Sequence, residues 1–207
     1  MPIIALVGNK GGAGKTTLSV NIAAGIARNH STAVLDADPQ GSSLQWRAFT
    51  EDENALDVFE ANGDLSEQIN ELKDKYHCLV IDCPPSVHAP QTNTVLRQCD
   101  IALIPVQPSP VDLWATVHTE RAIEEAKQDN PGLRAMLILN QLEARTTLSK
   151  LVREAAEEIE LPVAKTGIRR RAIYRNSALE GKSVFDIGAR GAEAANELNN
   201  LLEEVMI

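Results

Sequence analysis

The chain has 207 residues, of which 43% are hydrophobic, and it carries a formal net charge of −9 at pH 7. This length fits a single α/β domain with a substantial core. The acidic balance excludes a protein coated in basic surface. A local basic patch can still bind an anionic partner, because only charges within a Debye length, roughly 8–10 Å, act strongly. An apolar run follows the N-terminus directly, with no signal peptide, and no stretch of about 18 apolar residues could span a membrane, so we expect a cytoplasmic protein.

Strand-like and helix-like segments alternate along the chain without a repeat or a linker. Strands are expected at residues 2–8, 32–37, 77–83, 101–106, 134–140 and 161–166. Helices are expected at residues 15–29, 42–49, 65–75, 90–98, 112–129, 146–159, 170–179 and 189–205. The strands are continuous apolar runs, which is typical of parallel strands covered on both faces. The pattern predicts an α/β fold over residues 1–207, a doubly wound and mostly parallel sheet flanked by helices, with ligands at the carboxyl ends of its strands.

Residues 9–17, Asn-Lys-Gly-Gly-Ala-Gly-Lys-Thr-Thr, have the composition of a phosphate-binding loop. They lie between a predicted strand and a predicted helix, which is the context that such a loop requires. The glycines let the backbone N–H groups point inward, and the helix start adds its positive dipole end. Lys15 then pairs with the β- and γ-phosphates, and the Thr16 hydroxyl reaches Mg²⁺. The expected nucleotide-binding set is Lys10, Gly11, Gly12, Ala13, Gly14, Lys15, Thr16 and Thr17.

Lys10 is one lysine more than a phosphate loop needs. It lies at the mouth of the loop, where the phosphates of a facing subunit are easier to reach than its own. With Asn9 in place of the usual first glycine, the segment resembles the deviant Walker A loop, K-G-G-x-G-K-[ST]-[ST], of the ParA/MinD family of ATPases. The resemblance implies that Lys10 crosses a homodimer interface and contacts the partner's ATP. The alternative is an exposed lysine that only helps to attract ATP.

Two carboxylates, Asp36 and Asp38, end the second predicted strand and lie on the same side of it. An anionic pair beside a phosphate loop is expected where Mg²⁺ or a polarised water is present. The segment is similar to the D-x-D-P-Q switch of the family, which implies that Asp38 positions the attacking water and Asp36 supports the hydration shell of the metal. Lys10, Lys15 and Asp38 are then the catalytic residues of ATP hydrolysis. The alternative is a turn whose aspartates only cap the following helix.

The third predicted strand has the form of a Walker B segment, Leu-Val-Ile-Asp-Cys at residues 79–83, followed by two prolines. Its apolar residues bury it and leave the terminal carboxylate of Asp82 to hold Mg²⁺, often through water. The expected metal-binding residues are therefore Thr16, Asp36 and Asp82.

Two later strand ends carry further candidates. In the family, a residue at the position of Asn140 often hydrogen-bonds the adenine edge, so the resemblance assigns Asn140 to ATP binding; the alternative is a side chain that caps the following turn. A proline-rich stretch at residues 105–110 leads into a helix that lies at the dimer interface in the family. Trp114 on that helix is left open between interface and core.

Positive charge is concentrated between residues 165 and 190, which hold seven basic and two acidic residues. The segment has a formal charge of +5 within a chain of −9, so the remainder carries −14. Such a cluster is typical of contact with a phosphate backbone, and it resembles the region through which partition ATPases bind DNA non-specifically. The expected DNA-binding residues are Arg169, Arg170, Arg171 and Arg175. The alternative is a solvated helix face, or arginines that pair with acidic residues elsewhere on the surface.

The two ends of the chain separate branches of the family. The final helix holds four glutamates and no lysine or arginine after Arg190, which disfavours binding to an anionic membrane. Only eight residues precede the loop, so no N-terminal helix-turn-helix domain is expected.

The resemblance implies an ATP-dependent dimerising switch, associated with the nucleoid, that partitions or positions a cargo such as a plasmid, a chromosome segment or a carboxysome. Slow intrinsic hydrolysis would be stimulated by a cargo-adaptor partner protein. The alternative function is a metabolic enzyme on the same scaffold, of the dethiobiotin synthetase or amidase type.

Overall fold

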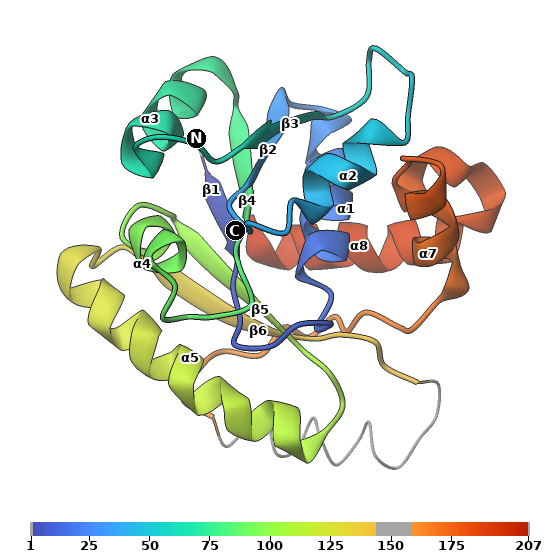
Figure 1. Cartoon of the computed structure of the whole chain (residues 1–207). Coiled ribbons are helices and arrows are strands. Elements are labelled where there is room, and N and C mark those ends of the chain that lie inside the picture. Colours follow the sequence, from blue (N-terminus) through green and yellow to red (C-terminus); the bar gives the residue numbers. More distant parts are fainter. Residues whose placement is uncertain (1, 144–158, 207) are drawn as a thin grey trace.

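The computed structural model describes residues 2–143 and 159–206, and in this part of the chain helices cover both faces of a parallel sheet (Figure 1). The sheet has six strands in the order β3-β2-β4-β1-β5-β6. The strands are β1 (Ile3–Leu6), β2 (Thr32–Asp36), β3 (Asp57–Glu60), β4 (Cys78–Asp82), β5 (Ile101–Val106) and β6 (Arg134–Leu139). The helices are α1 (Lys15–Ala27), α2 (Ser42–Ala48), α3 (Leu65–Lys75), α4 (Pro90–Leu96), α5 (Pro110–Asp129), α7 (Ala172–Leu179), the 3₁₀ helix η1 (Val184–Arg190) and α8 (Ala192–Val205). The predicted α/β class is confirmed.

Two hydrophobic cores lie on opposite faces of the sheet. One packs α3, α4 and α5 on the strands, with Ile69, Leu96 and Ile123 fully buried in it. The other packs α1, α7 and α8, with Ile22 and Leu198 at its centre. The four strands β1, β2, β4 and β5 are buried on both faces, which explains why they are continuous apolar runs in the sequence.

The strand register brings the chemically important residues to one edge of the sheet. Asp82 at the end of β4 is the register partner of Asp36 at the end of β2 and of Leu6 at the end of β1. The loop after β1 therefore begins beside two carboxylates from neighbouring strands, at the carboxyl edge where doubly wound folds bind ligands.

Two strand predictions were wrong, for different reasons. The strand β3 was missed because it has only four residues, lies at the sheet edge and is partly exposed. Residues 161–166 do not form a strand: they contribute only a bridge between Val163 and Leu137. Pro162 has no N–H to donate, and the N–H groups of Lys165 and Thr166 bond the Glu204 carboxylate at 2.7 and 2.8 Å instead of a neighbouring strand.

The helix predicted at 146–159 falls almost wholly on residues 144–158, which lie outside the described part of the chain. Across residues 2–143 and 159–206, no helix is both long and apolar enough to cross a bilayer.

Candidate nucleotide-binding site

The loop between β1 and α1 depends on glycine at two positions. Gly12 has φ of +78° and Gly14 has φ of +94°, a region that L side chains rarely adopt. A Cβ on Gly14 would lie 2.3 Å from Asn140 Nδ2, so any other residue there would have to displace the amide that donates to the Ala13 carbonyl oxygen. Gly14 is also the N-cap of α1, so the first helical N–H groups and the helix dipole face the loop. This geometry suits a phosphate.

Lys15 is the first residue of α1 and lies inside the loop, with 7% of its surface exposed. Its ammonium group donates to the Lys10 carbonyl oxygen at 3.0 Å. Burial lowers the pKa of Lys15, and the nearby carboxylates of Asp82 and Asp38 oppose that shift. A phosphate would supply further negative charge at the same position, so the site favours an anionic ligand.

Lys10 makes a contact that the sequence did not predict. Its ammonium group binds the Asp112 carboxylate near the start of α5, with the Lys10 side chain 40% exposed and the Asp112 side chain 16% exposed. An aspartate in the first turn of a helix is common because it stabilises the helix dipole, so the sequence offered no signal for this role. Lys10 therefore lies at the mouth of the loop, as expected, and is paired within its own chain.

Asp82 is the most deeply buried carboxylate of the site, with 1% of its surface exposed. Ser43 Oγ donates to one of its oxygens at 2.9 Å, and Ser19 Oγ donates to the other at 3.2 Å. Burial raises the pKa of Asp82 to about 6, against the opposite effect of hydrogen bonds from Thr16, Ser43 and Ser19. Hydroxyls and one carboxylate beside a phosphate loop fit Mg²⁺, which takes oxygen ligands and retains several waters. The sequence did not single out Ser19 or Ser43.

Asp36 and Asp38 have different surroundings. The Asp36 carboxylate accepts backbone N–H bonds from Ser43 at 2.8 Å and Leu44 at 3.1 Å, at the start of α2, and from Asp38 at 3.2 Å. Its burial nevertheless raises its pKa. The helix-capping alternative therefore describes its hydrogen bonds, and its support of a metal's hydration shell stays a prediction. Asp38 is partly exposed, and from the described residues its carboxylate accepts only a turn bond from the Gln40 N–H at 3.0 Å, which leaves it open to water.

Three side-chain amides hold the outer side of the loop. Asn140 Nδ2 donates to the Ala13 carbonyl oxygen at 2.7 Å. Gln107 Nε2 and Gln141 Nε2 both donate to the Gly12 carbonyl oxygen, at 2.6 and 2.9 Å. Gln107 follows β5, which lies next to β1, and Asn140 and Gln141 follow β6, which lies next to β5 at the edge of the sheet. Neither glutamine was predicted, because glutamine at a strand end is unremarkable in sequence.

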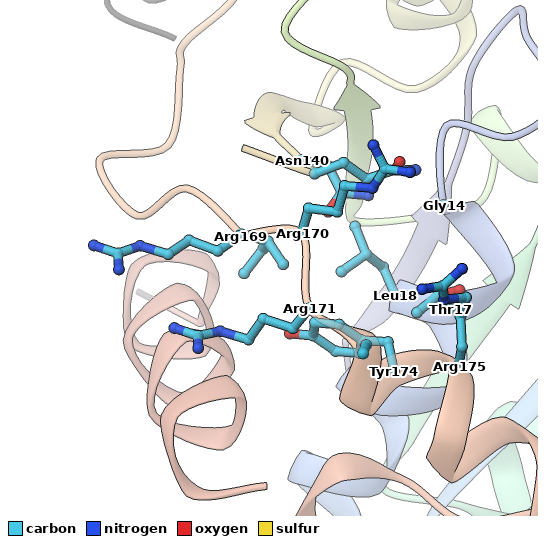
Figure 2. A pocket seen from close by; sticks show the side chains of 12 residues that line it. Gly14, Thr17, Leu18, Asn140, Arg169, Arg170, Arg171, Tyr174 and Arg175 are labelled. Carbon is cyan, nitrogen blue, oxygen red and sulfur yellow. The ribbon is translucent and has the colours of Figure 1, made fainter. Parts of the chain in front are cut away.

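A pocket of roughly 210 Å³ opens beside the loop (Figure 2). Its floor includes Gly14, Thr17 and Leu18 of the loop and α1, and Asn140 lies on one side. The rest of the lining comes from residues 168–172, Tyr174 and Arg175, a segment far away in sequence that lies alongside Asn140, because the Ile168 N–H donates to the Leu139 carbonyl oxygen at 2.9 Å. The Tyr174 hydroxyl is buried without a hydrogen-bond partner in the described structure. The structure thus brings Asn140 together with the phosphate loop, at one pocket.

The four arginines predicted to bind DNA all line this pocket, but most have protein partners. Arg171 is held by Glu193 and, at 2.7 Å, by Glu197 of α8, and these carboxylates raise its pKa. Arg169 lies 3.7 Å from Glu197, and Arg170 lies 3.5 Å from Glu143. For Arg171 the alternative of pairing with acidic surface describes the structure. Arg175 is exposed and has no ion pair within residues 2–143 and 159–206.

The exposed face of α5 carries an apolar stripe close to Lys10. Val111, Trp114 and Val117 are 56%, 72% and 42% exposed. Trp114 is therefore not a core residue, and its spacing with the two valines places all three on one helix face. Asp112, the partner of Lys10, lies on the same first turn of α5.

The chain is similar in sequence to known proteins and in fold to solved structures. The maintenance of carboxysome distribution protein A from Halothiobacillus neapolitanus is 42% identical over 206 residues, which cover 98% of this chain and 95% of that protein. An ATP complex of McdA from Cyanothece superposes with a TM-score of 0.80 at 14% identity and covers 100% of this chain and 97% of that one. Cobyrinic acid a,c-diamide synthase from Mycobacterium smegmatis, with ADP and magnesium, has a TM-score of 0.71 at 23% identity over 86% of this chain and 92% of its own.

These two solved structures, a McdA and a diamide synthase, both share the fold of this chain, so the fold alone does not assign a function. The 42% identity with the Halothiobacillus neapolitanus protein extends along nearly the whole chain. Residues 4–184 match the CobQ/CobB/MinD/ParA nucleotide binding domain. The chain belongs to this family and is a nucleotide-binding ATPase of the ParA type.

Proposed function

We propose that this chain is an ATP-dependent dimerising switch that binds DNA non-specifically and positions carboxysomes over the nucleoid. The observation that carries the proposal is the identity of 42% with a carboxysome distribution protein, combined with Lys10 at the mouth of a phosphate loop. A cargo-adaptor protein on the carboxysome would bind the dimer and stimulate slow intrinsic hydrolysis.

Different residues of the site bind the triphosphate, the Mg²⁺ and the base of ATP. The triphosphate lies in the loop from Gly11 to Thr17, against Lys15 and the N-terminus of α1. Mg²⁺, held by Thr16 and by Asp82 directly or through water, would neutralise phosphate charge. The base and ribose enter the pocket beside Gly14 and Thr17. Asn140 commits its Nδ2 to Ala13, so its Oδ1 is left as an acceptor, which suits the exocyclic amine of adenine and not the oxygen of guanine.

Hydrolysis is assigned to the two switch segments. Asp38 is open to water and follows the strand next to Asp82, so it can orient the attacking water. Lys10 of a second copy adds positive charge at the γ-phosphate, where a charge-assisted hydrogen bond is strong. Loss of the γ-phosphate then removes the group that both copies share, and the dimer separates.

DNA binding is assigned to the segment from residue 165 to residue 190. Dimerisation would double the number of basic residues that face the same duplex, and the two linked patches would bind with avidity. Arg175 is the strongest candidate among the predicted residues, because it is exposed and unpaired in the described structure. Arg171 is the weakest, because α8 already neutralises it.

DNA retention tests this proposal. Protein would be passed over immobilised non-specific DNA at fixed salt with Mg–ATP, with Mg–ADP and without nucleotide. We expect retention with ATP alone. Equal retention under all three conditions would contradict the switch, and turnover that requires a small-molecule acceptor would favour the metabolic alternative.

A further inference from the structure

The phosphate loop is restrained from outside by two glutamines. Gln107 Nε2 donates to the Gly12 carbonyl oxygen at 2.6 Å, and Gln141 Nε2 donates to the same oxygen at 2.9 Å. We propose that Gln107 and Gln141 are positioning residues that keep the peptide between Gly12 and Ala13 in the orientation that binds phosphate. The inference rests on the nucleotide-binding function proposed above and assigns two further residues to it.

Gly12 gains no restraint from packing around its Cα. It has φ of +78°, and apart from its own chain neighbours no described residue has an atom within 4 Å of the position that a Cβ would occupy. Glycine reaches this conformation without strain, but it also reaches most others. Rotation of the peptide after Gly12 would turn a carbonyl oxygen toward the place where N–H groups must meet the phosphates, and the two amides oppose this rotation.

Gln141 has a strained backbone conformation that this positioning role explains. It is the one non-glycine residue with positive φ, at +57°, in the described part of the chain. Non-glycine residues rarely hold this conformation unless surrounding contacts require it, and such outliers concentrate at functional sites. Here the conformation directs the chain beyond β6 so that the Gln141 amide reaches Gly12. The strain and the hydrogen bond are two separate observations that point to one role.

Gln107 connects the loop with α5. It follows β5 directly and precedes the helix that carries Asp112. Gln107, Asp112 and Lys10 line one small hollow next to the loop. The segment that restrains Gly12 is therefore also the segment that holds Lys10, so it sets the conformation of the loop and the position of Lys10 together.

The test compares nucleotide affinity with fold stability. Gln141→Gly removes the amide and also relieves the backbone strain, so the midpoint of thermal unfolding without nucleotide should stay the same or rise. The dissociation constant for Mg–ADP, measured by calorimetry, should increase about 2- to 12-fold, the range that loss of one such hydrogen bond gives. Gln107→Ala should raise it similarly. Because bound nucleotide itself orders the loop, kcat at saturating ATP should change little while KM rises.

Gln68→Ala is the matched control. Its Nε2 also donates to a backbone oxygen, Glu60 O at 2.8 Å, at an exposed position away from the loop. We expect this variant to bind Mg–ADP as the wild type does. If the wild type binds Mg–ADP and both Gln107→Ala and Gln141→Gly bind it equally well, the positioning role is wrong while the proposed function stands. If the wild type itself binds no Mg–ADP, the proposed function fails and this inference fails with it.

Discussion

The ion pair between Lys10 and Asp112 predicts that removing the Asp112 charge will stabilise the proposed ATP-bound dimer. In one copy, Asp112 holds the lysine that the proposed dimer needs at the partner's nucleotide. Lys10 must leave Asp112 before it can cross the interface. Asp112→Asn removes the competing charge, so ATP-bound protein should dimerise more tightly.

The magnitude follows from the exposure of the pair. With Lys10 40% exposed and Asp112 16% exposed, the pair is partly screened by solvent and is worth about 0.5–1 kcal/mol. A symmetric dimer breaks two such pairs, about 1–2 kcal/mol in total, which corresponds to a dimer dissociation constant about 5- to 30-fold lower in the variant. The effect should shrink as salt rises, because screening already weakens the pair in the wild type.

Sedimentation velocity with a non-hydrolysable ATP analogue would measure the dimer dissociation constant directly. Asp129→Asn is the control: it removes an ion pair with Arg97 at the other end of α5, 3.0 Å long and 60% exposed on both sides, and it should leave dimerisation unchanged. An Asp112→Asn dimer that is as weak as the wild type would refute the reasoning, and a weaker dimer would show instead that Asp112 aims Lys10 at the partner.

Three further predictions concern the site. Asp82→Asn should stabilise the nucleotide-free protein by about 2–3 kcal/mol at pH 7, because burial raises the pKa of Asp82 to about 6 from an ordinary value near 3.8. The gain should fade as pH drops through 6 and should be absent below 3.8, where the wild-type carboxyl is protonated in both the folded and the unfolded state. Mg²⁺-dependent nucleotide binding by this variant should be lost at any pH. Chemical denaturation across that pH range checks the sign, and a destabilised variant at pH 7 would count against it. Gly14→Ala should lower the free energy of unfolding by about 1–3 kcal/mol and abolish nucleotide binding, because φ is +94° at this position and a Cβ would lie 2.3 Å from Asn140 Nδ2. A variant that binds Mg–ADP in calorimetric titrations as tightly as the wild type would contradict this prediction. Arg175→Ala should reduce the slope of log DNA affinity against log salt concentration by about one counterion per copy, whereas Arg171→Ala should leave this slope unchanged. Equal slopes in the two variants would contradict the assignment of DNA binding to Arg175 in preference to Arg171.

Most of the fold could be predicted from the sequence because buried parallel strands are written as apolar runs. The two strand predictions that were wrong have different causes. Residues 161–166 look like a strand locally, yet the Glu204 carboxylate on α8 takes two of their N–H groups. The edge strand β3 was missed because its short, partly exposed sequence carries little pattern.

The site, too, has residues that the sequence predicted and contacts that it could not predict. Motif spacing placed Lys15, Asp38 and Asp82 at one edge of the sheet, and the structure brings them together. The contacts of Asp112, Gln107 and Gln141 could not be predicted, because each is a common residue type whose partner lies more than 90 positions away. Charge alone also misjudged the availability of Arg171, since its neutralising glutamates come from α8.

The central claim is that Lys10 makes ATP a signal for dimerisation, and one measurement tests it most directly. The mass of wild-type protein and of Lys10→Ala would be determined by light scattering with a non-hydrolysable ATP analogue and with ADP, after titration has shown that both bind nucleotide. We predict a wild-type dimer with the ATP analogue, a wild-type monomer with ADP, and a Lys10→Ala monomer with either. A Lys10→Ala protein that dimerises with the ATP analogue as well as the wild type would contradict the account.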